Sequence, residues 1–98
     1  MNLEKVSYLI TAIEAGSFSL AAEKLGMTQS GLNRQITSLE DELKTTLLLR
    51  GRRGVVPAKG AEPVIARLRE LLQHLNDVAA APPQALLRRL SGHYPFHR

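Results

Sequence analysis

Two short helices joined by a tight turn are predicted for residues 17–36, which read SFSLAAEKLGMTQSGLNRQI. Ser17 is a favourable N-cap for the first helix, and Gly26 is suited to the left-handed backbone that ends it. Thr28 is a favourable N-cap for the second helix, which is predicted to run over residues 29–43. Apolar side chains recur there at helical spacing, at Leu32, Ile36, Leu39 and Leu43. This helix therefore has one face that must be buried.

The opposite face of the second helix is polar and carries little charge. Its residues are Gln29, Ser30, Asn33, Arg34 and Thr37. A helix fits the major groove of B-DNA, where its first turns approach the base edges. Arg34 can donate two hydrogen bonds to guanine, and the amide of Gln29 or Asn33 can pair with adenine. The pattern predicts double-stranded DNA as the partner, and we add Ser17 and Thr28, at the two helix starts, to the candidate contact residues.

A further helix is predicted before this pair, and a hairpin after it. Between Asn2 as N-cap and Gly16 as the stop, apolar residues recur at Leu3, Val6, Leu9, Ile10 and Ile13. Residues 47–56 contain two apolar runs on either side of a basic turn, which is typical of a short hairpin. The tip and its flank carry Arg50, Arg52 and Arg53, which can contact a phosphate strand or a minor groove. The order predicts a mainly α winged helix-turn-helix over residues 1–58.

A longer helix is predicted for residues 62–80, because Pro63 suits a first turn and the apolar residues then keep a three-four repeat. The repeat consists of Ile65, Leu68, Leu72, Leu75 and Ala79. Such a stripe requires a partner surface, so residues 59–81 are predicted to form a linker helix that pairs two copies of the chain. Residues 82–98 begin with two prolines and have no apolar repeat, which predicts a weakly ordered tail.

Composition narrows the classes of function. The chain has 98 residues, no cysteine, and thirteen Lys or Arg against nine Asp or Glu, a net charge of +4. The absence of cysteine excludes a disulfide framework and a thiol nucleophile, and it fits a reducing compartment. No apolar run has the length of a membrane span, and the first residues do not resemble a signal peptide. We therefore expect a cytoplasmic protein without membrane contact.

Enzymatic and metal sites are not indicated. No catalytic triad, pair of catalytic carboxylates or phosphate-binding loop is recognisable. His93 and His97 are four residues apart, but Pro95 between them disfavours the helix that would bring both onto one metal ion. His74 lies outside the apolar repeat and is expected to face solvent. We therefore expect a non-enzyme without a cofactor or a metal.

Residues 15–25, 28–36, 39–43 and 47–50 together resemble the N-terminal DNA-binding domain of LysR-type transcriptional regulators. The resemblance covers roughly residues 1–80 and has no gap through residue 56. It implies a winged helix-turn-helix followed by a linker helix that pairs antiparallel in a dimer, so that two recognition helices read an interrupted dyad. It also implies DNA contacts at Gln29, Ser30 and Arg34, and a wing formed by Arg50, Arg52 and Arg53. A regulator of this family would be associated with the bacterial nucleoid.

Three departures from the family pattern carry expectations of their own. Asn33 replaces the usual serine, so a different base preference is expected. Lys44 stands where a glycine usually ends the recognition helix, so that helix end is expected to be strained or reshaped. The family's effector-binding domain of two α/β lobes is not recognisable in the sequence, so no small-molecule effector site is expected in this chain.

Three functions stay open at this point. The first is a dimeric, sequence-specific transcriptional regulator that places a recognition helix of about residues 29–43 in the major groove of a dyad operator. The second is a truncated interaction module that uses helix 62–80 to form heterodimers with a full-length regulator. The third is a non-specific nucleoid-type protein, for which phosphate contacts alone suffice.

Overall fold

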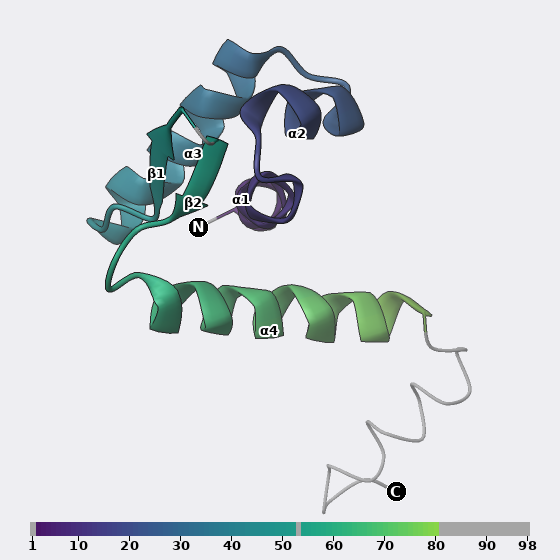
Figure 1. Ribbon diagram of the computed structural model, residues 1–98. Helices are drawn as coiled ribbons and strands as arrows, with labels where there is room; N and C mark the ends of the chain where they lie inside the picture. Colours follow the sequence, from purple (N-terminus) through teal and green to yellow (C-terminus); the bar gives the residue numbers. More distant parts are fainter. Residues whose placement is uncertain (1, 53, 81–98) are drawn as a thin grey trace, which may run out of the picture.

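Helices and one small hairpin make up the part of the chain that the structure describes (Figure 1). The computed structural model describes residues 2–52 and 54–80. These residues form α1 (Leu3–Ala15), α2 (Phe18–Leu25), α3 (Gln29–Leu43), β1 (Leu48–Gly51), β2 (Gly54–Pro57) and α4 (Glu62–Ala80). The predicted winged helix-turn-helix with a long fourth helix is therefore confirmed. The predicted tail, residues 82–98, lies outside the described residues.

Local sequence signals set the ends of the first helices. Asn2, Ser17 and Thr28 each accept, through a side-chain oxygen, a hydrogen bond from a backbone N–H group in the first turn, at 2.7, 3.2 and 3.0 Å. Gly16 and Gly26 take the left-handed conformation that ends α1 and α2. All five predicted caps are confirmed.

The C-terminal end of α3 uses a residue that is poorly suited to its backbone. Lys44 has φ 52° and ψ 41°, the left-handed conformation in which a residue with a side chain costs about 1–2 kcal/mol. Within the described ranges it is the one residue other than glycine with a positive φ. The N–H group of Thr45 still completes the helix end by donating to the Glu40 carbonyl oxygen at 3.0 Å. The expectation of a strained helix end at Lys44 is confirmed.

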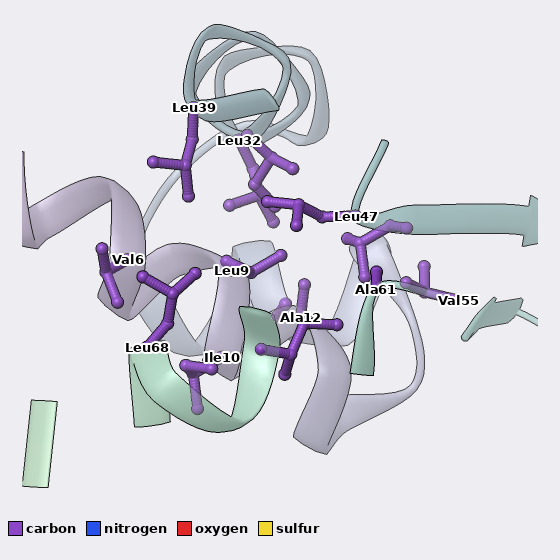
Figure 2. Close-up of a cluster of buried hydrophobic side chains, with 14 of the residues drawn as sticks. Val6, Leu9, Ile10, Ala12, Leu32, Leu39, Leu47, Val55, Ala61 and Leu68 are labelled. Atoms are coloured by element: carbon purple, nitrogen blue, oxygen red, sulfur yellow. The ribbon is translucent and has the colours of Figure 1, made fainter. Parts of the chain in front are cut away.

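The core surrounds α1. Figure 2 shows α3 on one side of α1, with Leu32 and Leu39 pointing inward, and α4 on the other side with Leu68. The side chains that are at most 6% exposed are Val6, Leu9, Ile10, Ala12, Ala21, Ala22, Leu32, Ile36, Leu39, Leu47, Leu48, Val55, Ala58, Ala61, Ile65 and Leu68. Each large aliphatic side chain buried in this way contributes roughly 1.5–3 kcal/mol. One continuous aliphatic core therefore joins the three helices, the hairpin and the first half of α4.

The hairpin is attached to the turn between α1 and α2. Its strands are antiparallel, with Gly51 opposite Gly54 at the tip end of the ladder. The N–H group of Val55 donates a hydrogen bond to the carbonyl oxygen of Gly16 at 3.0 Å. A Cβ atom at Gly54, whose φ is +107°, would collide with that same oxygen. The close approach therefore requires glycine at position 54 and fixes the hairpin on the helix-turn-helix.

In the first turns of α4, the side chains of the apolar repeat pack into the core of their own domain. Ile65 and Leu68 are each 5% exposed and belong to the core around α1. Their assignment to a seam between two chains is therefore corrected, because these side chains stabilise their own domain. Leu72 is half-buried against the same core, and Arg69 donates to Oε2 of Glu14 at 3.1 Å.

The second half of α4 carries an exposed apolar surface. Leu71, Leu75 and Val78 are 42%, 42% and 46% exposed, and we term them the exposed strip. Leu75 therefore stays available for the predicted pairing of two chains, while the side chain of Ala79 lies outside the described residues. The exposed strip shares Leu75 with the predicted seam, whereas α1 covers the first part of that seam, at Ile65 and Leu68.

Candidate nucleic-acid interface

The polar face of α3 is open to solvent. Gln29, Ser30, Arg34 and Thr37 are exposed, and Asn33 is half-buried. Their backbone is held by a helix whose opposite face is buried, so these side chains project from a rigid support. The fold therefore presents the residues that the sequence assigned to base contacts.

Two candidate contact residues also have a structural role. Oγ1 of Thr28 accepts the Gly31 N–H group at 3.0 Å and lies 3.4 Å from Oγ of Ser30. Oγ of Ser17 accepts the Leu20 N–H group at 3.2 Å. A hydroxyl that caps a helix through a lone pair keeps its own proton as a donor. Both caps can therefore hold their helices and still donate to a phosphate oxygen.

A shallow hollow of about 230 Å³ joins α2, α3 and β1. It is lined by Phe18, Gln29, Ser30, Asn33 and Arg50, and we term it the recognition hollow. The last four of these were predicted as contact residues on two separate elements, and the fold brings them together. Phe18 was interpreted from the sequence as a core residue, and its position in this hollow was missed.

Arg50 stacks on the ring of Phe18. Its Cζ atom lies 4.6 Å from the ring centroid, within the range of a cation–π interaction. Phe18 is the first residue of α2 and packs partly against the core, so the ring is held in place. No local pattern in the sequence links two residues this far apart. The attachment of the hairpin to the turn before α2 brings them into contact.

The side-chain amide of Asn33 has an incomplete set of hydrogen bonds. Its Oδ1 atom is buried and has no hydrogen-bond partner within residues 2–52 and 54–80. A buried acceptor without a partner costs about 1–3 kcal/mol. Asn33 therefore keeps unused hydrogen-bonding capacity at the wall of the recognition hollow.

The remaining candidate contact residues lie outside the recognition hollow. Arg34 and Thr37 are exposed on α3, and Arg52 is exposed at the hairpin tip. Arg53 lies outside the described residues. The surface thus combines hydrogen-bonding side chains on α3, suited to base edges, with cations on the hairpin, suited to phosphates.

Glu40 connects α3 with the hairpin. Its Oε2 atom accepts hydrogen bonds from the N–H groups of Leu47 and Leu48, at 2.7 and 3.2 Å. From sequence alone this carboxylate is simply unfavourable, because an anion near a helix C-terminus opposes the helix dipole. The two hydrogen bonds explain its position, since they fix the start of β1 relative to α3.

Glu42 is held by α1. Its Oε1 atom lies 2.6 Å from Nζ of Lys5, which also donates to Oγ of Ser38 at 2.9 Å. The hydrogen bond from Lys5 lowers the pKa of the Glu42 carboxyl. Glu42 therefore stays ionised at neutral pH, and its charge is compensated by α1.

Replacement of Glu40 is expected to loosen the hairpin from α3. In Glu40→Ala, the N–H groups of Leu47 and Leu48 lose a charged acceptor, and the free energy of unfolding is expected to fall by about 2–3 kcal/mol. Glu40→Gln keeps a neutral acceptor and is expected to lose about 1 kcal/mol. Urea denaturation followed by circular dichroism measures both losses.

Asp41 is the matched control for Glu40, because it is the next residue of α3 and is exposed. Asp41→Ala is expected to change the free energy of unfolding by less than about 0.5 kcal/mol. Equal losses in Glu40→Ala and Asp41→Ala would contradict the anchoring role of Glu40.

Metal ligands and membrane spans were sought among residues 2–52 and 54–80. These residues contain no group of three His, Asp or Glu side chains placed to share a metal ion. None of their helices combines the length and the hydropathy needed to cross a membrane. His74 is exposed, and His93 and His97 lie outside the described residues.

Known sequences resemble this chain over most of its length. The family model for bacterial regulatory helix-turn-helix proteins of the lysR family matches residues 3–62. The probable HTH-type transcriptional regulator LrrA of Synechococcus elongatus is 41% identical over 73 residues, which are 74% of this chain and 25% of LrrA. The nitrogen assimilation regulatory protein nac of Klebsiella aerogenes is 32% identical over 81 residues, 83% of this chain and 27% of nac. The chain spans about a quarter of the length of these relatives.

Solved structures share the fold. The crystal structure of the BenM_DBD/benA site 1 DNA complex superposes with a TM-score of 0.76 at 31% identity, covering 92% of this chain and 99% of that chain. CbnR, a LysR family transcriptional regulator, superposes with a TM-score of 0.74 at 28% identity, covering 81% of this chain and 27% of CbnR. The family model matches residues 3–62, which are more than half of the 98 residues of this chain. The chain therefore belongs to the lysR family of bacterial regulatory helix-turn-helix proteins.

Proposed function

We propose that the chain acts as the DNA-binding domain of a bacterial transcriptional regulator, in the cytoplasm and without enzymatic activity. The observation that carries this proposal is the exposed polar face of α3, which shares the recognition hollow with Arg50 of the hairpin. Arg52 is exposed at the tip of the same hairpin. The similar BenM_DBD structure is a complex with benA site 1 DNA, which supports a role for the same fold in DNA binding here.

The face of α3 supplies the groups that distinguish base pairs. Arg34 has the fork geometry for O6 and N7 of guanine, and the amide of Gln29 for N6 and N7 of adenine. Oδ1 of Asn33 lacks a donor among the described residues, and an amino group of adenine or cytosine supplies one. Arg50 and Arg52 bind phosphates, which carry no base identity. Sequence specificity is thus assigned to α3 and general affinity to the hairpin.

We also propose that two copies of the chain pair through the exposed strip. Leu71, Leu75 and Val78 are spaced by four and three residues, so they lie on one side of α4 and form a surface that a second helix can cover. Pairing brings two α3 helices to one DNA molecule, which raises the affinity for a dyad without any new contact to the bases.

Arg34→Ala tests the assignment of specificity. An operator is first selected from a pool of random duplexes, and affinity is then measured by gel shift at fixed salt. The variant is expected to lose about 1–3 kcal/mol on the selected operator and little on random DNA, because a base contact is lost. A dyad among the selected sequences would support the pairing of two copies.

Arg67→Gln is the control for charge. Arg67 lies on α4, and its side chain is 86% exposed. The same loss in both variants, or an unchanged ratio of operator to random affinity in Arg34→Ala, would contradict the role of Arg34. Equal wild-type affinity for all sequences would favour the nucleoid-type function. A chain that binds DNA only as a heterodimer with a longer relative would favour the interaction module.

A further inference from the structure

We propose that Phe18 is a positioning residue for DNA binding, because its ring holds the guanidinium of Arg50 ready to clamp one backbone phosphate at the edge of the recognition hollow. The inference rests on the DNA-binding function proposed above and deepens it. It names the chemical group that Arg50 takes, a phosphate, and the group that orients Arg50, an aromatic ring.

The contact with Phe18 leaves the N–H donors of the Arg50 guanidinium available for a ligand. A guanidinium is planar, and its five N–H donors point outward in that plane. Cζ lies over the ring of Phe18, 4.6 Å from its centroid, and the phenylalanine side chain has no oxygen or nitrogen to occupy these donors. Within the described residues, Arg50 makes no hydrogen bond or ion pair. The oxygens of a phosphate match this edge, because a guanidinium binds them with two parallel hydrogen bonds.

The hairpin attachment holds Arg50 and Phe18 in place relative to each other. Arg50 pairs with Val55 across the ladder, and the Val55 N–H group donates to the carbonyl oxygen of Gly16 at 3.0 Å. Gly16 is two residues before Phe18, whose ring packs partly against the core. A free arginine side chain loses much conformational entropy when it binds. The stack removes part of that loss before DNA arrives, which is the benefit of preorganisation.

The position of Arg50 favours a phosphate over a base. Arg50 belongs to β1 and flanks α3, whereas the amides that suit base edges, Gln29 and Asn33, lie on α3 itself. A phosphate contact is independent of DNA sequence. The contribution of Phe18 must therefore be visible on any duplex, and no operator is needed to measure it.

The experiment uses the whole chain and a fluorescent random-sequence duplex of about 30 base pairs, with affinity measured by anisotropy over a salt series. Arg50→Gln is expected to weaken binding about tenfold and to lower the slope of log affinity against log salt by about 0.9, the value for one phosphate. Phe18→Leu is expected to weaken binding about three- to tenfold, and Phe18→Tyr, which keeps the ring, to stay within about twofold of wild type.

The double variant separates positioning from a general structural role. If the ring acts through Arg50, adding Phe18→Leu to Arg50→Gln changes the affinity by less than about twofold. Arg67→Gln is the charge control and is expected to keep the wild-type salt slope. Arg50→Lys leaves the core untouched and keeps the charge but loses the planar stack, so it is expected to bind at least about threefold more weakly. If circular dichroism shows that Phe18→Leu is unfolded, the affinities of Arg50→Lys and Phe18→Tyr test the positioning role in its place.

The two possible failures are distinguishable. A wild-type chain that binds no duplex removes the proposed function, and this inference with it. If the wild-type chain binds, but the losses of Phe18→Leu and Arg50→Gln multiply in the double variant, the positioning role alone is overturned. Full affinity of Arg50→Lys, or a loss in Phe18→Tyr as large as in Phe18→Leu, has the same consequence.

Discussion

Leu68→Glu is expected to leave the chain largely unfolded at room temperature. Leu68 is 5% exposed and lies between α4 and α1 (Figure 2). The substitution removes a buried leucine and places a carboxylate where no partner reaches it, with an expected loss of about 4–6 kcal/mol. The whole stability of a domain of this size is of order 5 kcal/mol. Far-ultraviolet circular dichroism and thermal denaturation measure the result.

Leu75→Glu is the matched substitution on the same helix. Leu75 is 42% exposed in the exposed strip, so the stability of the single chain is expected to change by less than about 0.5 kcal/mol. The comparison with wild type is made at protein concentrations too low for pairing, because association adds to the apparent stability. Sedimentation at higher concentration is expected to show a wild-type dimer and a Leu75→Glu monomer.

Opposite results would identify which surface was assigned wrongly. A folded Leu68→Glu variant with native stability would mean that α4 does not pack against α1. A Leu75→Glu variant that still sediments as a dimer would mean that the exposed strip is not the surface where two copies pair.

Gly54→Ala is expected to detach the hairpin from the helix-turn-helix and to lower the free energy of unfolding by about 2–4 kcal/mol. The φ of +107° at Gly54 is unfavourable for any residue with a side chain. In addition, the new methyl group would collide with the carbonyl oxygen of Gly16, which accepts the Val55 N–H group. Urea denaturation measures the loss, and hydrogen exchange at Val55 shows whether the attachment opens.

Gly51→Ala is the control, because Gly51 lies opposite Gly54 in the same ladder. A Cβ atom there meets nothing within 4 Å. Its expected change in the free energy of unfolding is below about 1 kcal/mol. Equal losses at positions 51 and 54 would show that the hairpin tolerates no side chain at its turn, and would remove the special role of the contact with Gly16.

The structural features predicted best from the sequence are those that depend on residues close together in the chain. The caps at Ser17 and Thr28 and the stops at Gly16 and Gly26 depend on the few residues around them, and the structure confirms all four. Strain at Lys44 is expected from the family resemblance instead, because a glycine usually ends the recognition helix at this position, and the structure shows the left-handed backbone there.

Contacts between residues that lie far apart in the chain cannot be predicted from such local patterns. A three-four repeat shows that α4 has an apolar side, but it does not show whether α1 or a second chain covers Ile65 and Leu68. The role of Glu40 depends on where two N–H groups of the following loop point. The stack of Arg50 on Phe18 depends on the hairpin attachment at Gly16. Each of these requires the folded arrangement of elements that lie apart in the chain.

The double use of α4 has a consequence for the length of the DNA site. Its first half is fixed to α1 by Ile65 and Leu68, and the exposed strip lies on its second half. Two chains joined through that strip would hold their α3 helices at one separation and one rotational phase. Each added base pair turns the next half-site about 34° around the DNA axis, with about 10.5 base pairs per turn. A dimer built in this way would bind tightly only to DNA sites with one particular number of base pairs between the two half-sites. Sites with one base pair more or fewer would be bound more weakly.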